Sequence, residues 1–160
     1  DRFTIRIVPF EDLRPNKETL GQRSHLGGGA TMFKVGGGPP AEVAAKVIAE
    51  YLTQHGWNAT VGTDTGQSDV IITGRLTEFS VRAKSRFFST LLNTSLKLAL
   101  RAENTADASA TAMSLEDGRE DTVFWFEPSD LETLANEMLQ ESVKNMLASV
   151  QVKNRILRMK

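Results

Sequence analysis

The chain has 160 residues, of which 40% are hydrophobic and 24% charged, and it has a formal net charge of -1. This length is typical of one domain, which buries roughly 70% of the surface that the unfolded chain exposes. The near-neutral charge excludes a protein that wraps a polyanion with its whole surface. Because there is no cysteine, disulfides, thiolate metal sites and cysteine nucleophiles are also excluded. No run approaches the ~20 apolar residues of a membrane span.

The N-terminal part of the chain predicts a strand, a long loop, a helix and a second strand. Residues 3–10 alternate with the period of a strand. Residues 11–40 are rich in glycine and predict a loop that is functional, partly disordered or hiding a short strand near 31–35. Apolar residues at helical spacing predict a helix over about 40–55, which begins at its prolines and ends at Gly56 as a left-handed cap. A short strand is expected at 57–62.

The central part of the chain predicts long strands. One begins at Val70, and Gly74 is expected to mark a kink or bulge in it. Residues 96–102 alternate between apolar and mostly polar side chains, which indicates a strand with one buried face.

The C-terminal part predicts two more strands and a closing helix. The strands are expected at 106–115 and 122–126, with a turn between them at 117–118. Ser129 and Glu132 are spaced as a capping box, which starts a helix of some 20 residues. The buried stripe of this helix is expected to comprise Leu131, Leu134, Ala135, Met138, Leu139, Ser142, Met146 and Leu147.

This order of elements predicts one α/β (α+β) domain over residues 1–150. The expected architecture is a two-layer sandwich in which a mixed, largely antiparallel sheet of about five to six strands carries both helices on one face. Residues 151–160 are expected to form a basic C-terminal tail. This tail either extends the last helix as an amphipathic segment that touches anionic lipid or a partner, or complements the helix dipole.

Several short motifs resemble those of a known family. The stretch VPFEDLRPN at 8–16, followed by Leu-Gly at 20–21, resembles the opening of YajG-type bacterial lipoproteins. Those proteins continue with a helix that ends in a Gly-aromatic step, here at 55–57, and with a strand like that at 69–76. A long helix closes them, so the resemblance spans roughly residues 3–149.

The resemblance implies a location rather than a reaction. It implies a signal peptide and a lipid-modified cysteine before Asp1, which would anchor the domain on the periplasmic face of a bacterial membrane, expected to be the outer membrane. The family supplies no activity that can be transferred residue by residue. The glycine-rich insert at 27–38 and the tail after Val150 depart from its pattern.

The sequence contains no recognisable catalytic constellation. No serine-nucleophile motif is present, and the triple-glycine runs lack the Lys-Ser or Lys-Thr of a phosphate-binding loop. His25 and His55 have no metal-ligand partner at helical spacing. We therefore predict no catalytic residue, no metal and no cofactor. Carboxylates that only the fold brings together leave a carboxylate-based hydrolase as an open alternative.

Two groups of residues are candidates for binding. Asp12, Arg14 and Asn16 lie in a turn after the first strand, where a structural role for an Asp–Arg pair is favoured over ligand binding. The second group lies along a strand and the turn that follows it. It comprises Arg82, Lys84, Arg86, Phe87 and Phe88.

The second group favours a surface for a partner or for self-association. Period-two spacing places its cations on one face, and two adjacent aromatic rings cannot both point into a one-sided core. At least one ring is therefore expected to be exposed. The alternative is a twisted edge strand whose charges prevent aggregation while both rings tuck under the sheet.

The leading hypothesis is a non-enzymatic envelope lipoprotein domain that binds another cell-envelope component or itself. An alternative is a module that binds nucleic acid or another polyanion through the basic strand face, which steep salt dependence would reveal. No nucleic-acid partner is expected under the leading hypothesis.

Overall fold

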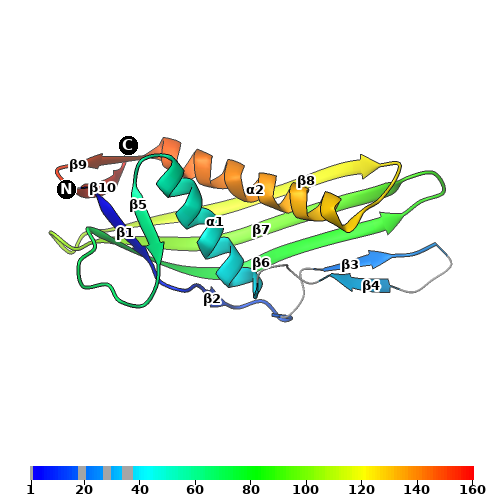
Figure 1. The fold of residues 1–160 in the computed structure, drawn as a ribbon, viewed down its shortest axis with the longest axis horizontal. Coiled ribbons are helices and arrows are strands. Elements are labelled where there is room, and N and C mark those ends of the chain that lie inside the picture. The colour runs from blue at the N-terminus through cyan, green and yellow to red at the C-terminus, as the bar shows by residue number, and fades with distance from the viewer. Residues whose placement is uncertain (1, 18–20, 27–29, 34–37) are drawn as a thin grey trace.

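The structure is a computed structural model that describes residues 2–17, 21–26, 30–33 and 38–160. Its elements follow the order shown in Figure 1. The helices are α1 (Pro40–Gln54) and α2 (Pro128–Ser149). The strands are β1 (Thr4–Ile7), β2 (Glu11–Asp12), β3 (Gly21–Ser24), β4 (Ala30–Phe33), β5 (Asn58–Val61), β6 (Val70–Ser85), β7 (Thr90–Asn104), β8 (Ala110–Val123), β9 (Val150–Lys153) and β10 (Ile156–Met159).

The central strand of the sheet is β6. On one side it pairs antiparallel with β7, which in turn pairs antiparallel with β8. On its other side it pairs with three short strands in succession, β1, β2 and β3, all parallel to it. Outside these lie β5, parallel to β1, and β4, antiparallel to β3. Since β6 has 16 residues and a strand rises about 3.3 Å per residue, the sheet is elongated, with both chain ends near one of its short edges (Figure 1).

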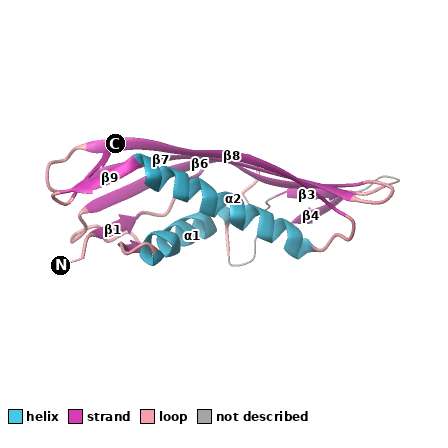
Figure 2. Cartoon of the chain, turned by 90° about the horizontal axis from the view of Figure 1, so that it is seen from above, coloured by secondary structure: helices cyan, strands magenta, loops and turns pink. Residues whose placement is uncertain are grey.

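Both helices cover the same face of this sheet (Figure 2). In the described part of the chain the sheet contains eight strands, among them the short β2, β3 and β4. The predicted fold class, a mixed sheet with two helices in a second layer, is confirmed. The layer between helices and sheet is the core, and its largest fully buried side chains come from both helices and from β1, β6, β7 and β8.

Both helices follow the sequence pattern closely. Pro39 is the N-cap of α1, and Gly56, with a φ of 94°, follows its end in the left-handed region, as predicted. The predicted buried stripe of α2 is confirmed, with only Leu147 half-buried. The predicted start of α2 is wrong, because Glu127 caps the helix and its N–H donates to Asp130 Oδ2 at 2.8 Å.

The predicted turn at 117–118 is wrong. β8 continues through it and pairs with β7 without interruption, from Ala110 opposite Glu103 to Val123 opposite Thr90. Pairing along the whole length of β7 outweighs the local Asp-Gly signal, and Gly118 does not adopt a positive φ. The irregularity in β6 lies between Leu76 and Glu78 rather than at Gly74.

Gly74 serves a different purpose from the predicted kink. A Cβ at this position would lie 2.6 Å from Phe10 Cδ1 and 2.8 Å from Leu100 Cδ2. The glycine therefore lets the Phe10 ring lie against the sheet, where this side chain is 7% exposed.

The segment predicted as one long loop at 11–40 contains strands. β2, β3 and β4 all fall within it, and β4 agrees with the alternative of a short strand near 31–35, of which residues 34–35 lie outside the described residues. The glycines at 27–29 and 36–37 lie outside the described residues. Gly21 permits a close approach of β3 to β6, because a Cβ there would meet the Val81 carbonyl.

The C-terminal tail forms the β9–β10 hairpin and does not extend α2. Asn154 and Arg155 make its turn with φ values of 53° and 60°. Arg155 donates to both carboxylate oxygens of Asp69, each at 2.7 Å, and to the carbonyl of Arg2 at 3.3 Å. This contact ties the C-terminal hairpin to the loop before β6 and to the N-terminal end of the chain.

We expect the Asp69–Arg155 pair to stabilise the fold at neutral pH and not in acid. The hydrogen bonds from Arg155, partly opposed by burial, lower the pKa of Asp69 from 3.8 to about 2. The folded-state pKa is thus below the unfolded one, so the contribution is complete above about pH 4 and is lost as the pH falls toward 2. Since Arg155 is half exposed, Asp69→Asn should lower the free energy of unfolding by about 1 kcal/mol at pH 7 and by little at pH 2.

Urea unfolding of parent and variant at both pH values measures this difference. Asp64→Asn is the matched control, because the Asp64 carboxylate is exposed and accepts a hydrogen bond from the Gly66 amide in its own turn. An Asp69→Asn effect that stays the same from pH 7 to pH 2 would contradict the assignment.

Candidate functional site

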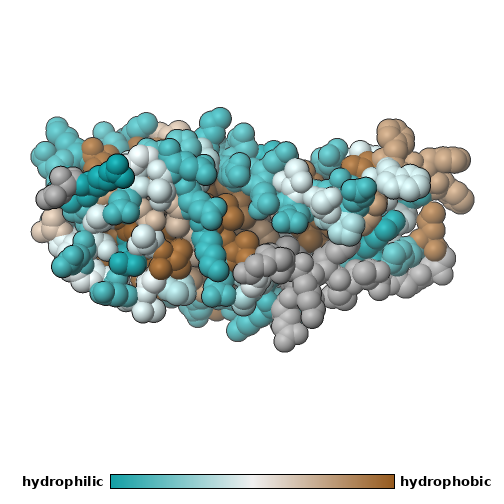
Figure 3. All heavy atoms as spheres, in the orientation of Figure 1, coloured by the Kyte–Doolittle hydropathy of each residue, from teal (hydrophilic) through white to brown (hydrophobic). Residues whose placement is uncertain are grey.

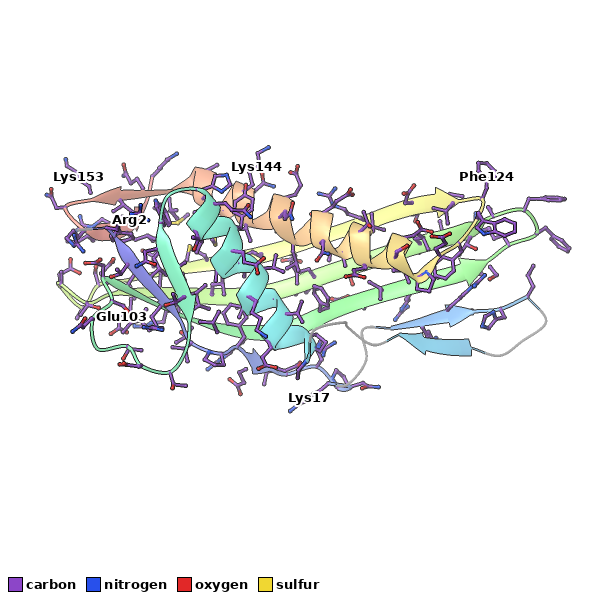
Figure 4. The ribbon with its side chains drawn as sticks, viewed as in Figure 1. Arg2, Lys17, Glu103, Phe124, Lys144 and Lys153 are labelled. Carbon is purple, nitrogen blue, oxygen red and sulfur yellow. The ribbon has the colours of Figure 1, made fainter. Side chains whose placement is uncertain are left out.

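The most conspicuous surface feature is a group of exposed aromatic rings at one end of the sheet. Phe87, Phe88, Phe124 and Trp125 are 86%, 88%, 86% and 85% exposed. Phe87 and Phe88 lie in the β6–β7 turn, and Phe124 and Trp125 directly follow β8. We call these four residues the aromatic tip. Apolar side chains gather at the right-hand end in Figure 3, and Figure 4 labels Phe124 at that end.

The strand register brings the two aromatic pairs together. Thr90, at the start of β7, is paired with Val123, at the end of β8. The β6–β7 turn and the loop after β8 therefore lie at the same end of the sheet. An aromatic side chain has roughly 150–250 Å² of surface, so the four exposed rings together match or exceed the largest apolar patch of a typical monomer, about 300–600 Å².

Turn chemistry does not explain the two phenylalanines. The turn is closed by a hydrogen bond from the Arg86 amide to the Ser89 carbonyl at 2.8 Å, so Phe87 and Phe88 are its two loop residues. Short turns favour Gly, Asn and Asp because these residues tolerate positive φ or bond to the backbone. Neither phenylalanine has a positive φ. Their side chains thus contribute nothing that the turn itself needs.

The second loop is held at both of its ends. Val123 before it and Phe126 after it pack against the core, while Phe124 and Trp125 project between them. The guanidinium of Arg23 lies 4.4 Å from the centre of the Phe126 ring. The bond from Glu127 to Asp130 fixes the start of α2 directly afterwards. The residues on both sides of the two exposed rings are therefore held by contacts with the rest of the domain.

Sequence reasoning found half of the tip. Phe87 and Phe88 are both exposed, whereas the pattern required exposure of only one. Phe124 and Trp125 were missed, because residues 122–126 were interpreted as a strand. A signal for them was present, since three consecutive aromatic residues at 124–126 cannot all point into a one-sided core.

The cations of the second candidate group lie beside the tip. Arg82 and Lys84 are exposed on the face of β6 that points away from the helices, and Arg86 precedes the turn. Acids share this face. Arg82 is in register with Asn93, which is in register with Glu120. The polyanion alternative needs a continuous basic surface, and these acids interrupt it.

Further along the same face, charges alternate across the sheet. Lys97 Nζ lies 3.8 Å from Glu78 Oε2 and 3.9 Å from Glu116 Oε1. The charged side chains in this part of the outer face therefore form ion pairs with one another.

The other candidate group is largely structural. Arg14, 6% exposed, binds Asp12 through Nε at 2.9 Å and Nη2 at 2.8 Å. It also donates to the carbonyls of Phe79 at 3.2 Å and Lys17 at 3.1 Å. Burial raises the pKa of Asp12, but its hydrogen bonds with Arg14 more than compensate and lower it below the usual value. The pair fastens the loop after β2 to β6, the role that the turn motif favoured.

The structure brings the two candidate groups to one depression. Arg14 and Asn16 line it from the loop, and Arg82 lines it from β6. The remaining members of the second group, from Lys84 to Phe88, lie further along toward the tip.

The histidines and carboxylates in the described residues do not form a metal site. His55 stacks on Tyr51, with ring centres 4.2 Å apart. Within those residues, no three side chains of His, Asp or Glu are grouped to hold a metal ion. Nor does any helix of the described part have the length and apolarity needed to cross a membrane.

Comparisons with known proteins find a similar fold among solved structures. No family model matches the chain, and no curated protein matches it by sequence. The fold is similar to that of protein XCC0632 from Xanthomonas campestris, of the family model DUF330, with a TM-score of 0.61 and 8% identity over 92% of this chain and 82% of that one. Lipoprotein GNA1162 from Neisseria meningitidis matches at a TM-score of 0.46 and 13% identity, over 91% of this chain and 98% of that one. At these identities the likeness concerns the fold alone.

Proposed function

We propose that this chain is the non-enzymatic domain of a bacterial envelope lipoprotein that binds another envelope component through the aromatic tip. The observation that carries the proposal is the exposure of Phe87, Phe88, Phe124 and Trp125 on two neighbouring loops at one end of the sheet. Aromatic residues are enriched where binding energy concentrates, and an apolar patch of this size marks an interaction site.

Two further points support the assignment to the envelope. The motifs at 8–16 and 69–76 resemble YajG-type lipoproteins, which implies a lipid anchor before residue 1. The described N-terminal end lies at the opposite end of the sheet from the tip (Figure 1). An anchor on the periplasmic side of the outer membrane would therefore leave the tip directed away from the attachment point.

We expect the chain to co-sediment with envelope fragments from a Gram-negative bacterium, and Phe87→Ser combined with Phe88→Ser to reduce the bound fraction at least fivefold. The serines remove exposed apolar surface and suit the turn, so the fold should persist. The matched control is Leu13→Ser with Met159→Ser, which changes two residues that are 49% and 48% exposed and lie outside the tip. Equal binding by parent, tip variant and control would refute the role of the tip.

Incorporation of a labelled fatty acid tests the lipoprotein part of the proposal separately. The full gene product, expressed with labelled palmitate, should incorporate the label whether or not the tip is changed. Absence of label would refute the anchor and leave the binding result to stand by itself.

A further inference from the structure

We propose that the aromatic tip inserts into the interfacial layer of a phospholipid bilayer. This inference rests on the proposed function and names the component that the tip binds. The rings of Phe87, Phe88, Phe124 and Trp125 would enter the layer between headgroups and acyl chains, while Arg86 and Lys84 lie at the level of the phosphates.

The residue types favour a lipid surface. Trp has an apolar body and one polar N–H group, and it is enriched where a membrane meets water. Phe supplies apolar surface that an interfacial segment buries in the acyl boundary. Arg86 immediately precedes the rings, and Lys84 lies two residues earlier on the exposed face of β6. Aromatic rings beside cations at the protruding end of a domain fit an interfacial layer.

The form of the tip also favours a fluid partner. Its rings lie on two separate loops that end the same sheet, and each is at least 85% exposed. The depression at Arg14 and the one around Ser95 are lined by residues of the sheet and its neighbouring loop, not by the tip rings. A protein partner would need a separate pocket for each projecting ring, whereas a bilayer adapts to all four without shape complementarity.

The mixture of cations and acids at this end of the sheet limits the expected preference for anionic over neutral lipid. Arg82, Lys84 and Arg86 lie on the β6 side of the tip, but the exposed Glu120 and Asp121 lie on the β8 side. Their opposing effects on an anionic surface partly cancel. Ring insertion must therefore supply most of the binding, and anionic lipid should raise the affinity only a few-fold.

The test uses the chain with Trp57→Phe, which leaves Trp125 as its one tryptophan. Trp57 is half-buried with its ring centre 5.9 Å from that of Phe3, so phenylalanine preserves an aromatic contact. The probes are vesicles of phosphatidylcholine alone and of phosphatidylcholine with phosphatidylglycerol in equal parts. We expect the Trp125 emission to shift to shorter wavelength on both vesicles and to be quenched by lipids brominated near the headgroup end of the acyl chain.

In the same background, Phe87→Ser with Phe88→Ser should weaken vesicle binding at least tenfold, and Leu13→Ser with Met159→Ser should leave it unchanged. Far-ultraviolet circular dichroism establishes that each variant is folded. If the turn variant unfolds, Phe124→Ser replaces it, because that change leaves the β6–β7 turn intact.

The outcomes separate this inference from the proposed function. Retained binding to envelope fragments without any Trp125 shift on vesicles would overturn the lipid inference and indicate a protein or polysaccharide at the tip. Absence of binding to envelope fragments together with absence of the Trp125 shift would overturn both the proposed function and the lipid inference. A Trp125 shift that disappears at moderate salt and is absent on phosphatidylcholine would show charge attraction without insertion, which also overturns the inference.

Discussion

Leu139→Ala is expected to lower the free energy of unfolding by about 2–5 kcal/mol. Leu139 lies in the middle of α2, is 1% exposed, and belongs to the core that α2 forms with the sheet and with α1. Truncation removes buried apolar surface and leaves a cavity that the surrounding side chains cannot fully close. Because α2 covers the sheet from β8 toward β6, the loss should appear as destabilisation of the whole domain.

The neighbouring residue on α2 provides the control. Gln140→Ala changes an exposed position and replaces glutamine with a better helix former, so its effect should stay within about 0.5 kcal/mol. Urea unfolding followed by circular dichroism measures both variants. Equal, small losses at the two positions would mean that α2 is not packed on the sheet as the structure shows.

The parts of the fold that sequence predicted well are those with a repeating pattern. The periodicity around Leu139 identified α2, and the alternation at 96–102 identified the buried face of β7. Both patterns extend over many residues, so a single unusual position does not obscure them. The order of the elements, in turn, predicted that both helices lie on one face of the sheet.

The predictions that failed depended on short local signals. The Asp-Gly pair at 117–118 indicated a turn, but in the structure Asp117 Oδ1 accepts a hydrogen bond from the Gly118 amide at 2.8 Å while the strand continues. The Ser129 capping signal failed in the same way. A serine cap contributes only about 1 kcal/mol, and in the structure the helix begins at Pro128 with Glu127 as its N-cap.

The incomplete prediction of the aromatic tip follows from the error at 117–118. With a turn there, residues 122–126 become an independent strand, and nothing places Phe124 beside Phe87. Only the register of β8 against β7 brings the two loops together. Such a register depends on contacts between residues far apart in sequence, which the alternation of a single strand does not specify.

The C-terminal hairpin is the other feature that local patterns could not reveal. Its turn contains Asn154 and Arg155 rather than a glycine, and it is stabilised by contacts to distant residues. Asp69 holds the turn through Arg155, and Asn104 holds β10. The basic residues of the tail indicated either an amphipathic extension of the last helix or cations that complement its dipole. The segment instead forms a hairpin in which Leu157 is 2% exposed.

Replacing Asn104 with Ala is therefore expected to release β10 and to cost about 2–4 kcal/mol of stability. Asn104 is completely buried at the end of β7. Its amide donates to the Leu157 carbonyl at 2.9 Å and to Ser109 Oγ at 3.0 Å, and its Oδ1 accepts from the Leu157 amide at 2.7 Å. Alanine removes both bonds to the Leu157 backbone, and the remaining bond to its carbonyl, from Thr111 Oγ1, is long at 3.5 Å. Movement of the hairpin into water would satisfy the freed groups.

Hydrogen exchange distinguishes this local release from general destabilisation. In Asn104→Ala the amides of β9 and β10 should exchange far faster than in the parent, while those in the middle of β7 remain protected until global unfolding. Asn93→Ala is the control, since Asn93 lies on the same strand but on its outer, partly exposed face. If the two variants lose equal stability and β10 stays protected in both, Asn104 does not clamp the hairpin. A selective loss at β10 would establish that one buried amide joins the C-terminal segment to the sheet.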